Sequence, residues 1–178
     1  SKKEEAKLKP SENGYRPTKP DNRNEELTRQ VKCLLNKICP DNSQVIVERL
    51  ADIELQNSDE LYLVIQIIFR KALDEPHYCE TYADMVQSLK SRYPEFPPDE
   101  EGEKPLTFVR VLLNTSQVEY ECLPTSIDPP AEDRAKMSSE EIAEYQKKVK
   151  SKAMANMKFI GNLYLRSLLA AKVISGVI

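Results

Sequence analysis

The chain has 178 residues, of which 40% are hydrophobic and 31% are charged, so it can build the core of one ordinary domain beneath a highly charged surface. A formal net charge of −3 argues against a strongly basic nucleic-acid-binding domain. With only 4 glycines and no run of about 20 apolar residues, the sequence lacks both Gly-rich phosphate loops and a membrane span. The 12 prolines between long periodic segments favour helices over sheets.

Residues 1–24 combine Lys, Glu, Pro and Asn with almost no apolar side chains. Such a segment cannot offset its ordering entropy by burying apolar surface, so we expect a disordered lead-in over residues 1–24. The first residues also lack the apolar run of a secretory signal.

From Glu25 the pattern changes, because apolar residues recur at helical spacing up to Ile38 and form one stripe. This stripe predicts a first helix that is ended by Pro40, which can then occupy the first turn of a second helix. The apolar stripe of the second helix begins at Ile46 and ends near Leu55.

A third helix is predicted to open at Asn57, which is followed by Glu60 at the spacing of a capping box. Its apolar side chains occupy so much of the helix circumference that we expect burial on several sides. Pro76 is predicted to start a fourth helix, which ends before Pro94.

Two proline-rich segments are predicted to be loops. Residues 94–104 are acidic and contain several prolines, which is typical of a surface loop. Pro105 is then expected to begin a fifth helix, and a second loop follows over residues 123–137.

A long last helix is predicted from the capping box formed by Ser138 and Glu141. Its first part is charged and mostly solvated, whereas its second part is richly apolar up to Leu169. A final segment, from Ala170 to the end of the chain, continues the apolar pattern.

The predicted helices fall into pairs with short internal turns, at residues 36–42 in the first pair and 73–76 in the second. The pairs start near Asn24, Ser58 and Lys104, a period close to the roughly 40–47 residues of helical-hairpin repeats. The sequence therefore predicts an all-α solenoid, a right-handed stack of antiparallel helix pairs that is truncated after about three repeats.

Three segments resemble the middle domain of eukaryotic translation initiation factor 4G. They are Val-Lys-Cys-Leu-Leu-Asn-Lys-Ile-Cys-Pro at residues 31–40, Phe-Arg-Lys-Ala-Leu-Asp-Glu-Pro-His-Tyr at residues 69–78, and Asn-Met-Lys-Phe-Ile-Gly-Asn-Leu at residues 156–163. They occur in the order and at the helix positions of that family. The resemblance implies a HEAT-like domain, with residues 25–178 as its N-terminal portion.

The resemblance also implies the partners. Members of the family bind a DEAD-box RNA helicase of the initiation factor 4A type, in the cytoplasm, and other initiation factors through regions that lie outside this chain. Ordinary turn chemistry is the alternative explanation for the polar turn residues. The candidate helicase-binding residues, taken from the family motifs and their turns, are Asn36, Lys37, Pro40, Asp41, Asn42, Glu75, Pro76, Tyr78, Asn156 and Lys158.

Positive charge is concentrated along the long last helix, where Lys147, Lys148, Lys150 and Lys152 follow one another closely. These lysines are candidates for phosphate contacts with RNA, which the resemblance favours. The alternative is an ordinary solvated helix face. Because no aromatic side chains are interleaved with them, we expect RNA binding to be weak, electrostatic and independent of sequence.

Catalytic, metal-binding and cofactor-binding residues are not predicted. His77 is the only histidine, so neither a His-based metal site nor a Ser-His triad is easily built. The neighbouring acids Asp74 and Glu75 are more typical of solvated or capping carboxylates than of an acid–base pair. The four cysteines show no C-x-x-C spacing, which indicates free thiols in a reducing compartment, the cytosol or the nucleus.

The sequence thus predicts a non-enzymatic scaffold of translation initiation, without metal, cofactor or membrane attachment, that binds a helicase. Two alternatives stay open. One is a related adaptor of splicing, nonsense-mediated decay or deadenylation that binds a different helicase. The other is a plain RNA-binding helical repeat.

Overall fold

The structure is a computed structural model, and it describes residues 22–97 and 105–170. Residues 1–21 of the predicted lead-in, most of the predicted acidic loop and the last segment of the chain lie outside the described residues.

Helices account for nearly all the regular structure in these two ranges. A single antiparallel bridge between Phe96 and Leu106 joins the two sides of the acidic loop. No helix that the structure describes is both long enough and apolar enough to cross a membrane. The helices are α1 (Arg23–Leu35), η1 (Pro40–Asn42), α2 (Ser43–Ala51), α3 (Ser58–Asp74), η2 (Pro76–Tyr78), α4 (Cys79–Leu89), α5 (Phe108–Glu121), α6 (Ala131–Arg134) and α7 (Ser139–Leu165), where η1 and η2 are short 3₁₀ turns.

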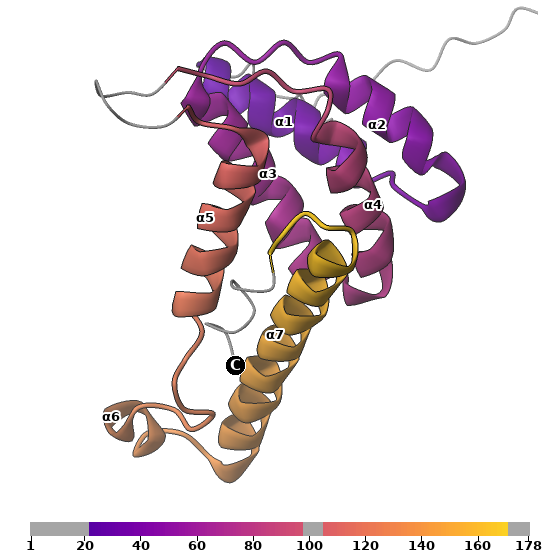
Figure 1. Ribbon diagram of the computed structural model, residues 1–178. Helices are drawn as coiled ribbons and strands as arrows, with labels where there is room; N and C mark the ends of the chain where they lie inside the picture. Colours follow the sequence, from indigo (N-terminus) through magenta and orange to yellow (C-terminus); the bar gives the residue numbers. More distant parts are fainter. Residues whose placement is uncertain (1–21, 98–104, 171–178) are drawn as a thin grey trace, which may run out of the picture.

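The long helices form two layers (Figure 1). In one layer α3 packs between α1 and α5, and in the other α4 packs between α2 and α7. Each pair therefore contributes one helix to each layer, as α1 with α2, α3 with α4, and α5 with α7. This arrangement confirms the predicted all-α stack of antiparallel helix pairs.

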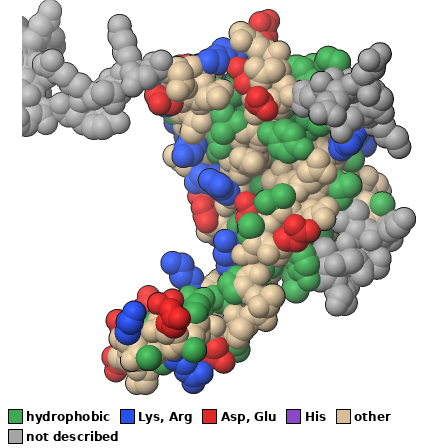
Figure 2. All heavy atoms as spheres, turned by 90° about the vertical axis from the view of Figure 1, so that its left-hand side faces the viewer, with side chains coloured by type: hydrophobic (Ala, Val, Ile, Leu, Met, Phe, Trp, Pro, Cys, Tyr) green, Lys and Arg blue, Asp and Glu red, His purple; other side chains and the backbone are tan. Residues whose placement is uncertain are grey.

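The second half of α7 is the main contact between the third pair and the rest of the core, because it packs against both α3 and α4. Phe159 on α7 meets Phe69 on α3 edge to face, with the ring centroids 4.9 Å apart, and neither ring is exposed. The first half of α7 and α6 extend beyond this body. Figure 2 shows this lower part standing away from the body, with acidic and basic side chains next to each other on its surface.

The helix starts follow the predicted caps in most places. Ser138 and Glu141 form the complete capping box, since Ser138 Oγ accepts from the Glu141 amide at 3.2 Å and Glu141 Oε2 accepts from the Ser138 amide at 2.7 Å. Helix α1 begins at Arg23, earlier than predicted, because the Asn22 side chain accepts from the Glu25 amide at 2.9 Å and caps it.

Three other predicted boundaries differ. The fifth helix begins at Phe108 and not at Pro105, because the Thr107 hydroxyl accepts from the Arg110 amide at 3.2 Å and sets the N-terminus there. Pro76 opens a 3₁₀ turn, and the α-helix proper starts three residues later. The predicted loop over residues 123–137 contains the short helix α6.

The predicted capping box at Asn57 and Glu60 is only half formed. The Asn57 side chain accepts from the Glu60 amide at 2.9 Å, but the Glu60 carboxylate bonds the Gln56 amide at 2.9 Å and Arg23 Nε at 3.0 Å. Glu60 is only 2% exposed, so this ion pair ties the first residue of α1 to the first turn of α3. The hydrogen bond from Arg23 lowers the pKa of Glu60 and outweighs the opposing effect of burial.

Removing this carboxylate should change how stability depends on pH. Folding lowers the pKa of Glu60 from its usual value of 4.5. The ionised carboxylate therefore contributes fully to the free energy of unfolding above pH 4.5, and this contribution is lost as pH falls through the lower pKa of the folded state. We expect Glu60→Gln to lower the free energy of unfolding by about 2 kcal/mol at pH 7, with a smaller difference at pH 3. Urea unfolding across this pH range measures it, and the exposed Glu95→Gln serves as control. A difference that is constant with pH would contradict the assignment.

Helix α7 ends at Leu165, earlier than the apolar pattern predicted. Ser167 has φ of 56°, in the left-handed region. Its amide bonds the Tyr164 carbonyl at 2.9 Å, and the Leu168 amide bonds the Leu163 carbonyl at 3.0 Å. These two bonds form a Schellman cap, which ends the helix and returns the buried Leu168 to the core.

A serine with positive φ carries a steric cost that glycine does not. We therefore expect Ser167→Gly to raise the free energy of unfolding by about 1 kcal/mol. Ser167→Ala keeps the Cβ and should leave stability nearly unchanged. Equilibrium urea unfolding of both variants compares them directly. Equal stability of the Gly and Ala variants would show that the conformation carries no cost.

Candidate functional site

The turns after α1 and α3 lie on the same side of the molecule. Helices α1 and α3 are neighbours in one layer and run in the same general direction, so the turns that follow them both emerge on the right-hand side of Figure 1, the second below the first. These turns contain most of the predicted helicase-binding residues. We call residues 36–42 and 75–78 together the turn edge.

The first turn of this edge is closed by its own side chains. Asn42 Nδ2 donates to the Lys37 carbonyl at 2.7 Å, and its Oδ1 accepts from the Cys39 amide at 2.8 Å. The Ser43 hydroxyl donates to the Pro40 carbonyl at 3.0 Å. Asn42 therefore holds the turn together. The predicted residues with exposed side chains in this turn are Asn36, Lys37, Pro40 and Asp41.

In the second turn, Glu75 bonds within the molecule. Its carboxylate accepts from Lys71 Nζ at 2.7 Å and from the Tyr82 hydroxyl at 2.6 Å. Burial tends to raise the pKa of Glu75, but the bonds from Lys71 and Tyr82 lower it below its usual value. Burial and the bond to Glu75 raise the pKa of the Tyr82 hydroxyl. Glu75 thus fixes the end of α3 onto α4, and its charge is already paired.

The remainder of the second turn faces outward. Pro76 and Tyr78 are half-buried and His77 is exposed, with the His77 and Tyr78 rings 4.3 Å apart. Lys158 Nζ, on α7, donates to the Pro76 carbonyl at 3.1 Å. The structure therefore places Lys158 against Pro76, in the same turn as Tyr78.

Asn156 lies in the core and offers no surface to a partner. It has 0% exposure, and its side-chain nitrogen and oxygen have no hydrogen-bond partner among the described residues. The reason is helical phase, because Asn156 shares a face of α7 with the buried Phe159 and Ile160. We therefore exclude Asn156 from the surface available to a helicase.

The four lysines predicted to bind RNA are exposed but do not form one patch. Lys148 and Lys152 border a cleft of about 970 Å³ between α7 and α5, which is also lined by Asp74, Glu119 and Glu144. The positive charge on this face is therefore partly offset by acids. Such a division follows from helix geometry, since residues two apart point in different directions.

Lys150 faces a second cleft on the other side of α7, and Lys147 borders both. This second cleft, which we call the α7 cleft, has a volume of about 800 Å³. Its lining residues are Pro76, Ala143, Gln146, Lys147, Lys150, Ser151, Met154, Ala155 and Lys158.

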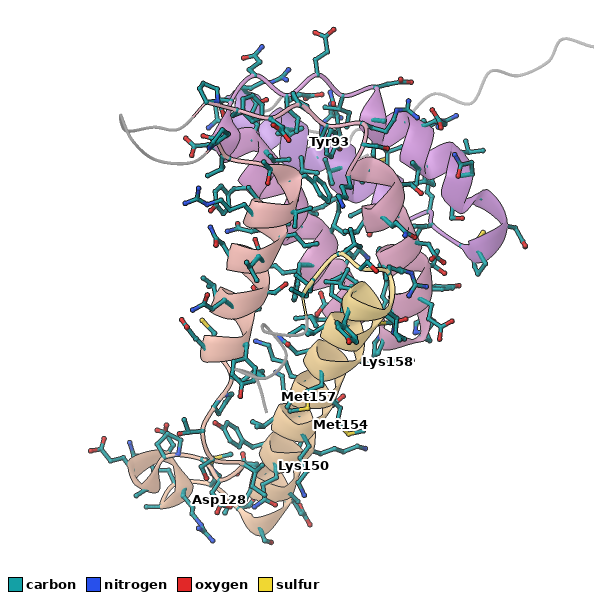
Figure 3. The ribbon with its side chains drawn as sticks, in the orientation of Figure 1. Tyr93, Asp128, Lys150, Met154, Met157 and Lys158 are labelled. Carbon is teal, nitrogen blue, oxygen red and sulfur yellow. The ribbon has the colours of Figure 1, made fainter. Side chains whose placement is uncertain are left out.

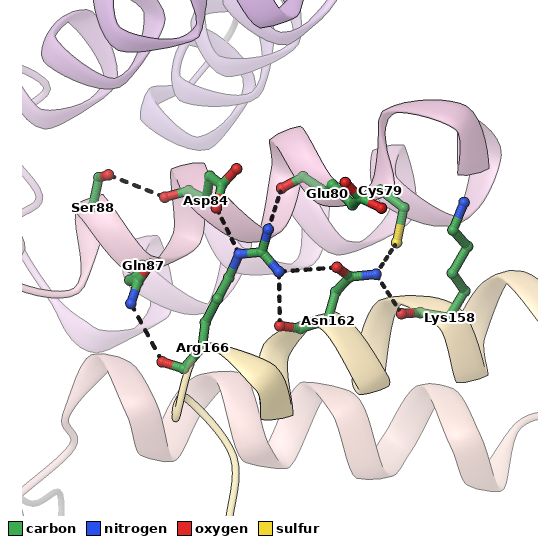
Figure 4. A network of polar contacts seen from close by, with 8 residues as sticks. All are labelled: Cys79, Glu80, Asp84, Gln87, Ser88, Lys158, Asn162 and Arg166. Atoms are coloured by element: carbon green, nitrogen blue, oxygen red, sulfur yellow. Dashed lines mark hydrogen bonds and ion pairs between the residues drawn. The ribbon is translucent and has the colours of Figure 1, made fainter.

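A polar network missed by the sequence motifs fixes the end of α7 to α4 (Figure 4). Arg166 Nε bonds Asp84 Oδ1 at 2.6 Å, and Arg166 Nη1 bonds Asn162 Oδ1 at 2.9 Å. Asn162 Nδ2 also lies 3.6 Å from the sulfur of Cys79, a thiol whose pKa is raised by burial. The sequence feature that could have indicated this network is Arg166, a single charged residue at the end of an apolar helix segment.

Comparison with known proteins identifies the family. Residues 28–178 match the family model described as the MIF4G domain. The chain belongs to the MIF4G family. The three sequence segments that resemble the middle domain of initiation factor 4G lie at the end of α1 with η1, at the end of α3 with η2, and on the buried half of α7.

Two curated relatives illustrate the extent of the match. Eukaryotic translation initiation factor 4G of Arabidopsis thaliana is 34% identical over 149 residues, which cover 82% of this chain and 8% of that protein. Eukaryotic translation initiation factor 4 gamma 3 of Homo sapiens is 28% identical over 185 residues, which cover 92% of this chain and 12% of that protein. This MIF4G chain therefore spans only a small part of either relative.

A solved structure has the same fold. The MIF4G domain of Trypanosoma cruzi translation initiation factor EIF4G5 matches with a TM-score of 0.61 and 23% sequence identity. The match covers 85% of this chain and 64% of the other one. It supports the helical-pair architecture described above for this MIF4G chain.

Proposed function

We propose that this MIF4G chain is a scaffold of translation initiation, located in the cytoplasm, that binds a DEAD-box RNA helicase of the initiation factor 4A type. Its curated relatives are named as translation initiation factors 4G and support the first part of this proposal. The observation that supports the second part is the turn edge, where two successive turns with internally fixed backbones present exposed side chains on one side of the stack.

The turn edge is suited to protein binding because it is rigid before a partner arrives. Asn42 fixes the first turn and Glu75 fixes the second, so little backbone entropy remains to be lost on binding. The proposed contacts are the outward side chains of this edge and Lys158 beside it. A scaffold favours a half-closed helicase only by binding that state more tightly, which requires contacts with both lobes, so the turn edge accounts for binding of one lobe and not for most of the activation. The proposed contact residues are Asn36, Lys37, Pro40, Asp41, Pro76, Tyr78 and Lys158.

A charge reversal on the first turn tests this edge without disturbing the fold. Lys37 and Asp41 are both exposed, whereas Glu75 is unsuitable because its replacement would break the bonds to Lys71 and Tyr82. We expect the double change Lys37→Glu and Asp41→Lys to weaken helicase binding by about 30-fold, the equivalent of about 2 kcal/mol.

Isothermal titration with the C-terminal lobe of the helicase measures this effect, and a melting curve of each variant verifies the fold. Lys90→Glu is the control for a charge reversal elsewhere, because Lys90 is exposed at the opposite end of α4 from the turn edge. Unchanged affinity in a normally folded double variant would remove the turn edge as the binding site.

A related adaptor of splicing, nonsense-mediated decay or deadenylation, bound to a different helicase, is the alternative to an initiation scaffold. A pull-down of purified DEAD-box helicases by this chain, after nuclease treatment, distinguishes the two. Preferential capture of the initiation factor 4A type supports the initiation scaffold. Capture of another helicase in its place would assign the chain to one of the other processes.

Weak RNA binding is a second proposal, supported by the exposure of Lys147, Lys148, Lys150 and Lys152 along α7. Changing all four to Glu should weaken binding of every RNA sequence alike. For single-stranded RNA, a plot of log affinity against log salt concentration has a negative slope. We expect the magnitude of this slope to fall by about 0.7 for each phosphate that these lysines no longer neutralise. Fluorescence anisotropy of labelled RNAs across a salt series measures this slope. An unchanged slope would place any RNA site elsewhere.

A further inference from the structure

The α7 cleft is an uncovered face of a helix with an unusual composition. Apart from Pro76, its lining residues come from α7 at positions spaced three or four apart, which is one continuous helix face. From Ala143 to Lys158 this face extends for about 22 Å, or four helical turns. Figure 3 shows Lys158, Met154 and Lys150 one after another down α7, away from the body.

The floor of the α7 cleft is aliphatic. Pro76, Ala143, Met154 and Ala155 line it, and Met154 is 71% exposed. A methionine left in solvent on a regular helix gives an adaptable surface that packs well against aliphatic side chains. The described lining residues include no aromatic ring on which an RNA base could stack. This floor therefore suits apolar side chains of a protein better than nucleotides.

The rim of the α7 cleft is basic. Lys147, Lys150 and Lys158 border it, and the described lining residues include no Asp or Glu. The cleft on the other side of α7 differs, because three carboxylates accompany its lysines. Lys158 is already held in place by its bond to the Pro76 carbonyl, yet its ammonium group has further protons to donate. One carboxylate lies beside the lining, because Asp128 accepts from Gln146 Nε2 at 2.7 Å. The three lysines still outnumber it, and this excess of positive charge favours acidic groups on a partner that covers this face.

We propose that the α7 cleft binds an acidic amphipathic helix of a partner protein. The aliphatic side chains of that helix contact Met154 and Ala143, and its carboxylates lie against the three lysines. The length of the face matches a helix of about 15 residues, a common size for helix-in-groove recognition. The α7 cleft shares Pro76 and Lys158 with the proposed helicase-binding surface, whereas Lys150 and Met154 belong to the cleft alone.

The test measures binding of a synthetic peptide to the full chain. The peptide has 16 residues, with Leu and Glu at helical spacing, and is labelled with fluorescein. Binding is measured by fluorescence anisotropy. We expect the acidic peptide to bind at least ten-fold more tightly than a peptide in which Lys replaces Glu. A peptide in which Ser replaces Leu should also bind at least ten-fold more weakly, because it cannot use the aliphatic floor.

Two pairs of variants locate the peptide on α7. Met154→Glu and Lys150→Glu should each weaken binding at least five-fold. Met157→Glu and Lys152→Glu should leave it unchanged, because these residues are exposed on the same helix but do not line the cleft. All four side chains are exposed, so each variant should fold, and melting curves verify this. The variant Lys37→Glu with Asp41→Lys should bind the peptide normally, which separates this site from the helicase proposal.

Other outcomes would overturn the proposal. Equal loss in all four variants would mean that the peptide responds only to net charge. A parallel titration with a uridine decanucleotide tests RNA, and selective loss of RNA but not of peptide binding in Met154→Glu and Lys150→Glu would assign the cleft to RNA. Dimerisation of the chain that is abolished by Met154→Glu, with no peptide binding, would make this face a contact between copies.

Discussion

The architecture depends on the packing of the second half of α7 against the core. The second half of α7 packs against both α3 and α4. Its Phe159 meets Phe69 at 4.9 Å, and Arg166 at its end bonds Asp84 at 2.6 Å. Because the helix is 27 residues long and only this half is buried, its first half must leave the body. The projecting part, the α7 cleft and the lysines on both sides of the helix all follow from this packing.

The two turns show that polar surface residues can have different roles, either fixing the backbone or facing the solvent. Asn42 and Glu75 look like partner-binding residues in the sequence, but the structure uses both to fix the backbone. Lys37 and Asp41, beside them, are exposed. The division makes physical sense, because a docking surface needs groups that stay in position as well as groups that face the partner.

Helical periodicity and capping chemistry were sufficient to predict the helix pairs and the N-cap of α7 at Ser138, since these features are local in the sequence. The burial of Asn156 could have been predicted from its helical phase relative to Phe159. The ion pair between Arg23 and Glu60 could not, because it joins residues from different pairs. Likewise, the carboxylates near Lys148 and Lys152 include Asp74 and Glu119, contributed by other helices. Local pattern therefore accounts for the fold, whereas the electrostatic character of each face depends on the packing.

A helix that is clamped at one end and free at the other behaves as a lever. Helix α7 is about 40 Å long, and its fixed end carries the Arg166 bonds to α4. A tilt of a few degrees at that end moves the distant α6 by several ångströms, and force applied near α6 is transmitted back to α4 with mechanical advantage. Lys158 lies between the two ends and donates a hydrogen bond to the Pro76 carbonyl, so such a tilt would displace this bond at the turn between α3 and α4. A partner that pulls on the protruding tip would therefore act on the turn between α3 and α4 through this one hydrogen bond.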